Sequence, residues 1–168
     1  MYPVMYIRYA YFGSVMAIHS ILTHPWNSAL LGSSQTPALQ HDISISAHVV
    51  VNAARSIILD TDVIHTDVST PIWLALYFPL VSVINIFIYI LKYPALPTAP
   101  SDLALLDIAT GHFARLEFAS PDIALPFVRE IARLARATIE FTKNTTQSPG
   151  SLGQDLTLAA PQTFENYR

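Results

Sequence analysis

The sequence predicts an all-α fold: an irregular multi-helix array with a long central apolar helix and a disordered carboxyl-terminal tail. Two observations support this class. Apolar residues recur at steps of three and four in successive segments, which is the spacing of one face of an α-helix. No strand-pairing signal and no internal repeat accompanies them. We place one helical domain at residues 1–143 and the tail at residues 144–168.

Composition limits the functions that the chain can have. Its 168 residues suggest a single domain, and 52% are apolar while only 12% are charged, about half the usual share. A surface so poor in charge is expected to be covered partly by a partner or by lipid. The net charge of -3 gives no general attraction for phosphate backbones, so we expect no direct DNA binding. The absence of cysteine excludes disulfides, thiolate zinc sites and a cysteine nucleophile.

The first helix is predicted from an apolar stripe that ends at His24, Pro25 and Trp26. The stripe that we expect to be buried consists of Val4, Ile7, Tyr11, Val15, Ile18 and Leu22. Residues 27–40 are rich in Gly, Ser and Pro, and are interpreted as a loop.

The second helix is predicted to begin after Asp42, whose side chain can accept hydrogen bonds from the free amides of a first turn. Its expected buried positions are Ile43, Ala47, Val50, Ala54 and Ile57. The opposite stripe, formed by His48, Asn52 and Arg55, is expected to face water or a polar partner.

The third helix is the long apolar one. Thr70 followed by Pro71 is a start signal, and no charged residue occurs between Asp67 and Lys92. Residues 72–91 are long enough to cross a bilayer, which needs about 20 helical residues. The alternative hypothesis is therefore a small single-span membrane protein with the helix 72–91 crossing the bilayer.

A polar stripe favours a buried core helix over a membrane span. Ser82, Asn85 and Tyr89 lie three and four residues apart on one face of the third helix, and Pro79 interrupts its middle. A helix surrounded by lipid needs no such stripe. We predict that these three residues form a buried polar stripe and that membrane association is not the function.

The last two helices follow a connector made stiff by Pro94, Pro97 and Pro100. Ser101 is predicted to cap the fourth helix, in which the buried stripe is Leu106, Ala109, Phe113 and Leu116. The fifth helix is predicted to begin near Pro126 and to end at Lys143. Its expected buried residues are Phe127, Ile131, Leu134 and Phe141.

One basic face on the fifth helix is a candidate interaction surface for phosphates or an acidic partner. Its residues are Arg129, Arg133, Arg136 and Lys143. Glu140 interrupts the same face, so a solvated surface with internal ion pairing is the favoured interpretation.

No enzyme site, metal or cofactor is predicted. Six histidines occur, but none forms the close pair with a carboxylate that a zinc hydrolase helix presents. The loop at residues 60–67 carries Asp60, Asp62, His65 and Asp67, which could in principle assemble acid and base chemistry. Such a loop is more often simply a place where charge is tolerated, so the chain is expected not to be an enzyme.

Several segments, taken in order, resemble one known family. They are residues 53–58 (Ala-Ala-Arg-Ser-Ile-Ile), residues 71–73 (Pro-Ile-Trp), residues 91–94 (Leu-Lys-Tyr-Pro) and residues 101–106 (Ser-Asp-Leu-Ala-Leu-Leu). From about Tyr11 to Thr142, the chain resembles the carboxyl-terminal half of the fungal-specific regulatory region, or middle homology domain. That region belongs to transcription factors of the binuclear zinc cluster family.

The resemblance implies an all-helical, non-enzymatic region that regulates transcription in the nucleus. Zinc is expected only in the family's six-cysteine DNA-binding module, which this sequence lacks, together with the earlier half of the regulatory region. The implied partners are proteins, either full-length relatives or a second copy of this chain. Because half of such a domain would expose apolar surface, we expect the chain to associate non-specifically or to form dimers.

Overall fold

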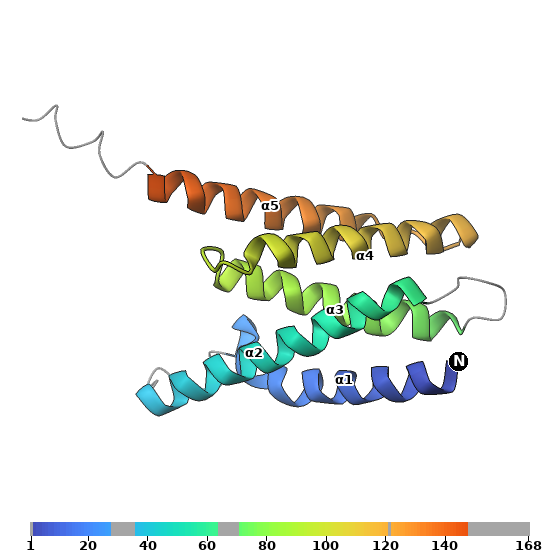
Figure 1. Cartoon of the computed structure of the whole chain (residues 1–168), viewed down its shortest axis with the longest axis horizontal. Helices are drawn as coiled ribbons and strands as arrows, with labels where there is room; N and C mark the ends of the chain where they lie inside the picture. The colour runs from blue at the N-terminus through green and yellow to red at the C-terminus, as the bar shows by residue number, and fades with distance from the viewer. Residues whose placement is uncertain (1, 28–35, 64–70, 121, 148–168) are drawn as a thin grey trace, which may run out of the picture.

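The computed structural model describes residues 2–27, 36–63, 71–120 and 122–147, and these residues form an all-helical array (Figure 1). The helices are α1 (Tyr2–Thr23), α2 (Pro37–Asp60), α3 (Ile72–Lys92), α4 (Ala99–Ala119) and α5 (Pro126–Gln147). Short 3-10 turns, η1 (Pro25–Asn27) and η2 (Thr61–Val63), follow α1 and α2. No strand occurs within these ranges, and the predicted all-α class is confirmed.

The helices lie side by side in the order α1, α2, α3, α4 and α5 across the molecule (Figure 1). The helix α1 packs mainly on α2 and touches α3 at far fewer positions. The helix α3 contacts α2, α4 and α5, so the predicted central position of the apolar helix is confirmed. Its fully buried residues include Leu74, Ala75, Val83, Ile86 and Ile90.

Among the described residues, two helices are long and apolar enough to cross a membrane: Pro37–Val63, which includes η2, and Ile72–Lys92. In each helix, half of the most apolar stretch is buried against other parts of the protein. Core helices of soluble proteins pass the same test of length and composition. The helix α3 is therefore shielded by neighbouring helices on one side, and its other side is half-buried between Phe78 and Ile90.

Two helix starts differ from the prediction. The helix α2 begins at Pro37, and Thr36 caps it by accepting a hydrogen bond from the Leu39 amide, so the expected cap at Asp42 and the loop over residues 37–40 are wrong. The helix α4 begins at Ala99 without a side-chain cap, so Ser101 lies inside it. Both starts place a proline in the first turn, where its missing N–H costs no helical hydrogen bond.

The helix α5 begins at Pro126 as predicted but continues past Lys143 to Gln147. Thr142, Thr145 and Thr146 each donate a hydroxyl hydrogen bond to the carbonyl four residues earlier. Such bonds let polar residues remain in a helix whose apolar pattern has stopped. The rest of the predicted tail, residues 148–168, lies outside the described residues.

The helix α1 buries a different face from the one predicted. The core receives Met5, Tyr9 and Met16, whereas Val4, Ile7, Tyr11 and Ile18 are between 64% and 67% exposed; the other two predicted residues, Val15 and Leu22, are half-buried. Both sets of residues have helical spacing, because α1 is apolar on nearly every side. Periodicity alone therefore could not choose between the two faces.

The helix α5 shows the same kind of error. Its buried residues are Val128, Ala132, Ala135 and Ile139, while Phe127, Leu134 and Phe141 are exposed and Ile131 is half-buried. Small alanine side chains allow α5 to approach its neighbours closely. The predicted stripes of α2 and α4 are correct, except that Ile43 is only half-buried.

Candidate interaction site

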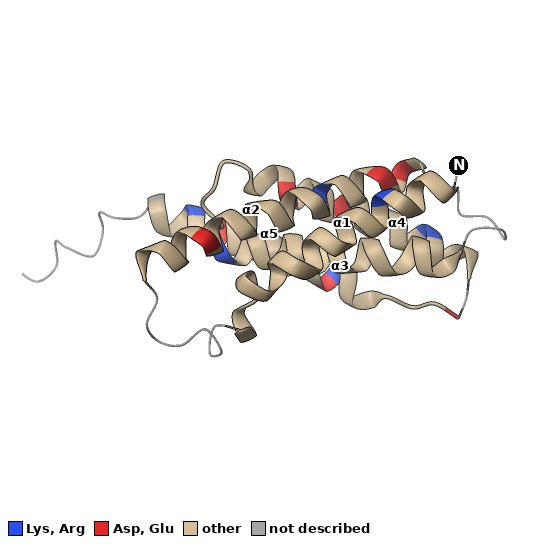
Figure 2. Cartoon of the chain, turned by 90° about the horizontal axis from the view of Figure 1, so that it is seen from below, with Lys and Arg blue, Asp and Glu red and all other residues tan. Residues whose placement is uncertain are grey.

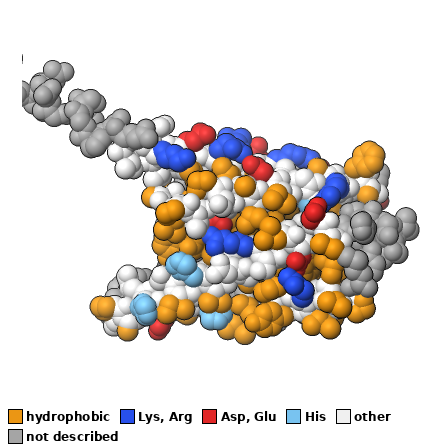
Figure 3. Space-filling model, in the orientation of Figure 1, with side chains coloured by type: hydrophobic (Ala, Val, Ile, Leu, Met, Phe, Trp, Pro, Cys, Tyr) orange, Lys and Arg blue, Asp and Glu red, His pale blue; other side chains and the backbone are white. Residues whose placement is uncertain are grey.

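The outward face of α1 is a long apolar surface. We call it the α1 surface, and it consists of Val4, Ile7, Tyr11, Ile18 and Ile21. Arg8 is the one charged residue of α1; it lies four residues after Val4 and three before Tyr11, so it borders the α1 surface, and its charge is paired with Asp60. Figure 3 shows hydrophobic side chains gathered along this edge of the molecule. Exposed apolar surface without charge is typical of a protein interaction site.

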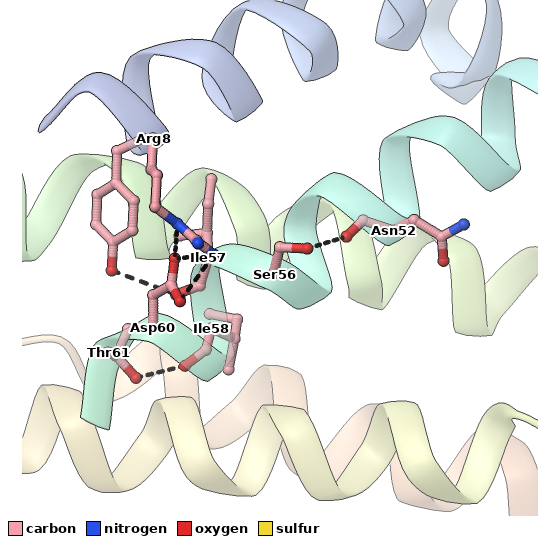
Figure 4. Close-up of polar contacts among 8 residues, drawn as sticks. Arg8, Asn52, Ser56, Ile57, Ile58, Asp60 and Thr61 are labelled. Atoms are coloured by element: carbon pink, nitrogen blue, oxygen red, sulfur yellow. Dashed lines mark hydrogen bonds and ion pairs between the residues drawn. The ribbon is translucent and has the colours of Figure 1, made fainter. Parts of the chain in front are cut away.

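An ion pair fixes how α1 sits on α2. The Arg8 guanidinium donates two hydrogen bonds to the Asp60 carboxylate, at 3.0 and 3.1 Å (Figure 4). Beside it, the buried Tyr9 hydroxyl donates to the Ile57 carbonyl at 3.3 Å. Burial, followed by the nearby Asp60 carboxylate, raises the pKa of Tyr9, so this hydroxyl remains a neutral donor. These contacts turn the α1 surface away from the core.

A groove of about 580 Å³ separates α1 from α3 beside the α1 surface. Tyr6 and Trp73 meet edge to face across its mouth, with ring centroids 5.5 Å apart. At its floor, Gly13 faces Phe78 so closely that an added Cβ would lie 2.7 Å from the phenylalanine ring. A second hollow of about 650 Å³ lies where the carboxyl-terminal ends of α1 and α3 meet the start of α2. Aromatic rings and small residues therefore extend the apolar region from α1 onto α3.

The polar stripe of α3, formed by Ser82, Asn85 and Tyr89, lies inside the protein. Asn85 meets His24 at 3.1 Å and donates to the Val81 carbonyl at 2.9 Å. The Tyr89 hydroxyl meets the His48 Nε2 at 3.2 Å, and Ser82 donates to the carbonyl of Phe78 at 2.8 Å. Ser82 also donates to the Met16 sulfur of α1 at 4.0 Å, so all three residues connect α3 to other elements by hydrogen bonds.

The stripe predicted to face water or a polar partner does so: His48 and Asn52 are exposed, and Arg55 meets polar partners within the chain. Its guanidinium donates to both carboxylate oxygens of Asp102, at 2.6 and 2.8 Å, and to the Asn52 side chain at 2.8 Å. The side chain of Asp102 is 1% exposed and that of Arg55 is 24% exposed. This pair joins α2 to α4, and its hydrogen bond to Asp102 raises the already high pKa of Arg55.

The basic residues of α5 are largely paired with carboxylates. Figure 2 shows acidic and basic positions close together along the helices. Arg136 pairs with Asp107 at 2.9 Å, Arg129 pairs with Glu117, and Arg133 pairs with Glu130 at 2.8 Å, while Lys143 is exposed. Two of the three partners lie on α4, so the pairs mainly join two helices. Charges that are already paired attract phosphate weakly.

Glu117 also closes the turn before α5. Its carboxylate accepts a hydrogen bond from the Leu125 amide at 2.6 Å. That bond, and then the one from Arg129, lower the pKa of Glu117. The sequence did not single out Glu117 because its partners lie beyond the range of a helical turn.

The acidic loop does not assemble a catalytic site among the described residues. Asp60 is engaged by Arg8 and Asp62 is exposed, while His65 and Asp67 lie outside those residues. Across the described ranges, no three His, Asp or Glu side chains gather closely enough to hold a metal ion.

Comparison with known proteins gives a distant and partial similarity. The chain is 28% identical over 120 residues to an ABC-transporter-regulating transcription factor of Aspergillus fumigatus. It is 30% identical over 121 residues to a protein of the same description from Aspergillus oryzae. Each alignment includes 67% of this chain.

The chain spans only about 13% of the length of these curated relatives. No protein-family model and no solved structure matches it. The predicted resemblance is therefore supported at the level of distant homology: part of this chain is related to part of fungal transcription factors.

Proposed function

We propose that this chain is a non-enzymatic regulatory and interaction region of a fungal transcription factor that acts in the nucleus. The observation that carries the proposal is the similarity to two transcription factors over 120 and 121 residues of an all-helical chain. The resemblance to the later half of the fungal regulatory region agrees with it. Paired arginines on α5 and a net charge of -3 favour protein partners over direct contact with DNA.

The regulatory part of the proposal is tested by tethering. The full chain is fused to an unrelated DNA-binding domain and expressed with a reporter gene that carries the matching operator. We expect the fusion to accumulate in the nucleus and to change reporter transcription relative to the DNA-binding domain alone. A reporter that responds identically to both proteins would contradict the proposal. The unfused chain should not bind a labelled DNA duplex at low salt.

We further propose that the partner at the α1 surface is a second copy of this chain. A twofold interface places the same patch of both copies face to face, so a charged residue on that patch would face a residue of the same charge on the other copy. The five residues of the α1 surface are uncharged, the bordering Arg8 is paired with Asp60, and the surface extends over roughly 26 Å of helix from Val4 to Ile21. Two copies therefore meet without repulsion and remove exposed apolar side chains from water.

Self-association is tested by placing charge on this surface. Ile18→Glu should convert a dimer to a monomer in sedimentation equilibrium, because the carboxylates would face each other in an apolar interface. The side chain is 67% exposed, so folding of the single chain should be unaffected. Phe118→Glu is the matched control, since Phe118 is 92% exposed on α4. A monomeric wild-type chain, or equal loss of dimer in both variants, would contradict the proposal.

The alternative function is a membrane span, and one observation favours it: α3 is long and apolar enough to cross a membrane, and half of its most apolar stretch is not buried in the protein. Alkaline carbonate extraction of cells that express the chain separates the two possibilities. A regulatory region should be released with soluble and peripheral proteins. Retention in the pellet would support the membrane span and contradict the nuclear role.

A further inference from the structure

The interior of α3 contains Pro79. Proline has no backbone N–H, so Pro79 cannot donate the helical hydrogen bond to the carbonyl four residues earlier, which belongs to Ala75. Ala75 is completely buried. Because an unpaired buried carbonyl costs as much as a lost hydrogen bond, its donor has to come from elsewhere.

His112 of α4 supplies that donor. Its Nε2 lies 2.8 Å from the Ala75 carbonyl oxygen. Since a carbonyl only accepts, Nε2 carries the hydrogen and Nδ1 is the unprotonated nitrogen. The side chain is fully buried, and Nδ1 is a buried atom without a hydrogen-bond partner in the described structure. The site therefore suits a neutral imidazole, because it contains no acceptor for the second N–H that protonation would add.

The surroundings of His112 contain no compensating negative charge among the described residues that pack on α4. The helix α3 has no charged residue before Lys92, and α5 turns Val128, Ala132, Ala135 and Ile139 inward. On the α2 side, Asp102 is neutralised by Arg55, and Asp62 of η2 is exposed.

Burial is accordingly the main cause that lowers the pKa of His112, and Arg115 on the same helix adds to it. The hydrogen bond to Ala75 opposes this shift but is smaller in effect.

We propose that His112 acts as an acid-sensitive latch: its neutral imidazole holds α4 against α3 by the hydrogen bond to Ala75, at the point where Pro79 interrupts the helical hydrogen bonds of α3. Protonation at Nδ1 releases this contact between α3 and α4. The residue before Pro79 is Phe78, whose ring lies against Gly13 in the groove between α1 and α3. Release of the latch therefore alters one wall of that groove. The proposal does not depend on the transcriptional role.

Hydrogen exchange of the full chain between pH 5 and pH 7.5, corrected for intrinsic rates, tests the latch. The equilibrium constant for local opening at the α3 amides around Pro79 should increase by up to about tenfold for each pH unit below 6.5, because the open state binds one more proton. His112→Gln supplies a neutral donor that does not titrate, so this rise should be lost. His41→Gln, at an exposed position on α2, is the control and should keep it.

Two results would overturn the latch: an undiminished rise in His112→Gln, or an equal loss in His41→Gln. If His112→Gln does not fold, Pro79→Ala is added to it to make a double variant, because alanine restores a backbone N–H for the Ala75 carbonyl. The double variant should then regain cooperative unfolding. A double variant as unfolded as His112→Gln alone would overturn the proposal.

Discussion

At the scale of single residues, the chain concentrates its few charges in pairs that connect helices. Arg8 joins α1 to α2, Arg55 joins α2 to α4, and Arg136 joins α5 to α4. Their surroundings differ greatly, since Asp102 is buried whereas Asp107 is half exposed. The contribution to stability should therefore differ as well, because exposed pairs are screened by water and a buried carboxylate without its partner is strongly unfavourable.

Arg55→Met is expected to lower the free energy of unfolding by about 3 kcal/mol, since it leaves the Asp102 carboxylate buried without a counterion. The Arg55 side chain is partly exposed to water, so this loss of stability lies at the low end of the range for buried ion pairs. The exposed Arg133 is the matched control, and Arg133→Met should change stability by less than about 0.5 kcal/mol. Urea denaturation measures both values. Equal losses in the two variants would be inconsistent with a special role for Arg55.

At the scale of helices, the sequence predicted which segments are helical but not always which face is buried. The stripes of α2 and α4 were identified because their outer faces are polar or charged. In α1, Met5 and Tyr9 are four residues apart and Val4 and Ile7 are three apart; both are helical spacings, so no periodic signal separates core from surface. The face was decided instead by long-range contacts, such as the Tyr9 hydrogen bond to Ile57, which sequence spacing does not reveal.

The candidate site was predictable to a similar degree. The helical spacing of Ser82, Asn85 and Tyr89 was visible in the sequence, whereas their partners His24 and His48 are not adjacent to them in the chain. The basic face of α5 was visible too, but its carboxylate partners on α4 were not. The α1 surface was missed because four of its five residues, all but Ile21, were assigned to the core.

Two helical glycines should respond in opposite directions to alanine. A Cβ at Gly111 would meet nothing within 4 Å, so Gly111→Ala should raise the free energy of unfolding by about 1 kcal/mol through helix propensity. A Cβ at Gly13 would overlap the Phe78 ring, which is itself held against Tyr9 and Tyr77. Gly13→Ala should therefore lower stability by about 1–2 kcal/mol, as overpacking does. Chemical denaturation of both variants is the measurement, and stabilisation by Gly13→Ala would show that the ring moves aside freely.

At the scale of the whole molecule, stability should be unevenly distributed. The helix α3 is packed against α2, α4 and α5, whereas α1 rests mainly on α2 and leaves its outer face open. Regions with few buried contacts open locally at lower free energy than the core. The amides of α1 should therefore exchange with solvent faster than those of α3 when the protein is dilute.

The difference in hydrogen-exchange rate between α1 and α3 should depend on protein concentration if a second copy covers the α1 surface. Association stabilises the bound state by mass action, so α1 should become more protected as the concentration rises, while α3 should change little. The Ile18→Glu variant should show fast α1 exchange at every concentration, because its interface carries opposed carboxylates. Hydrogen exchange at two concentrations, followed by mass spectrometry of peptides from α1 and α3, makes the comparison. Protection of α1 that is independent of concentration in the wild-type chain would mean that another partner, or none, binds this surface.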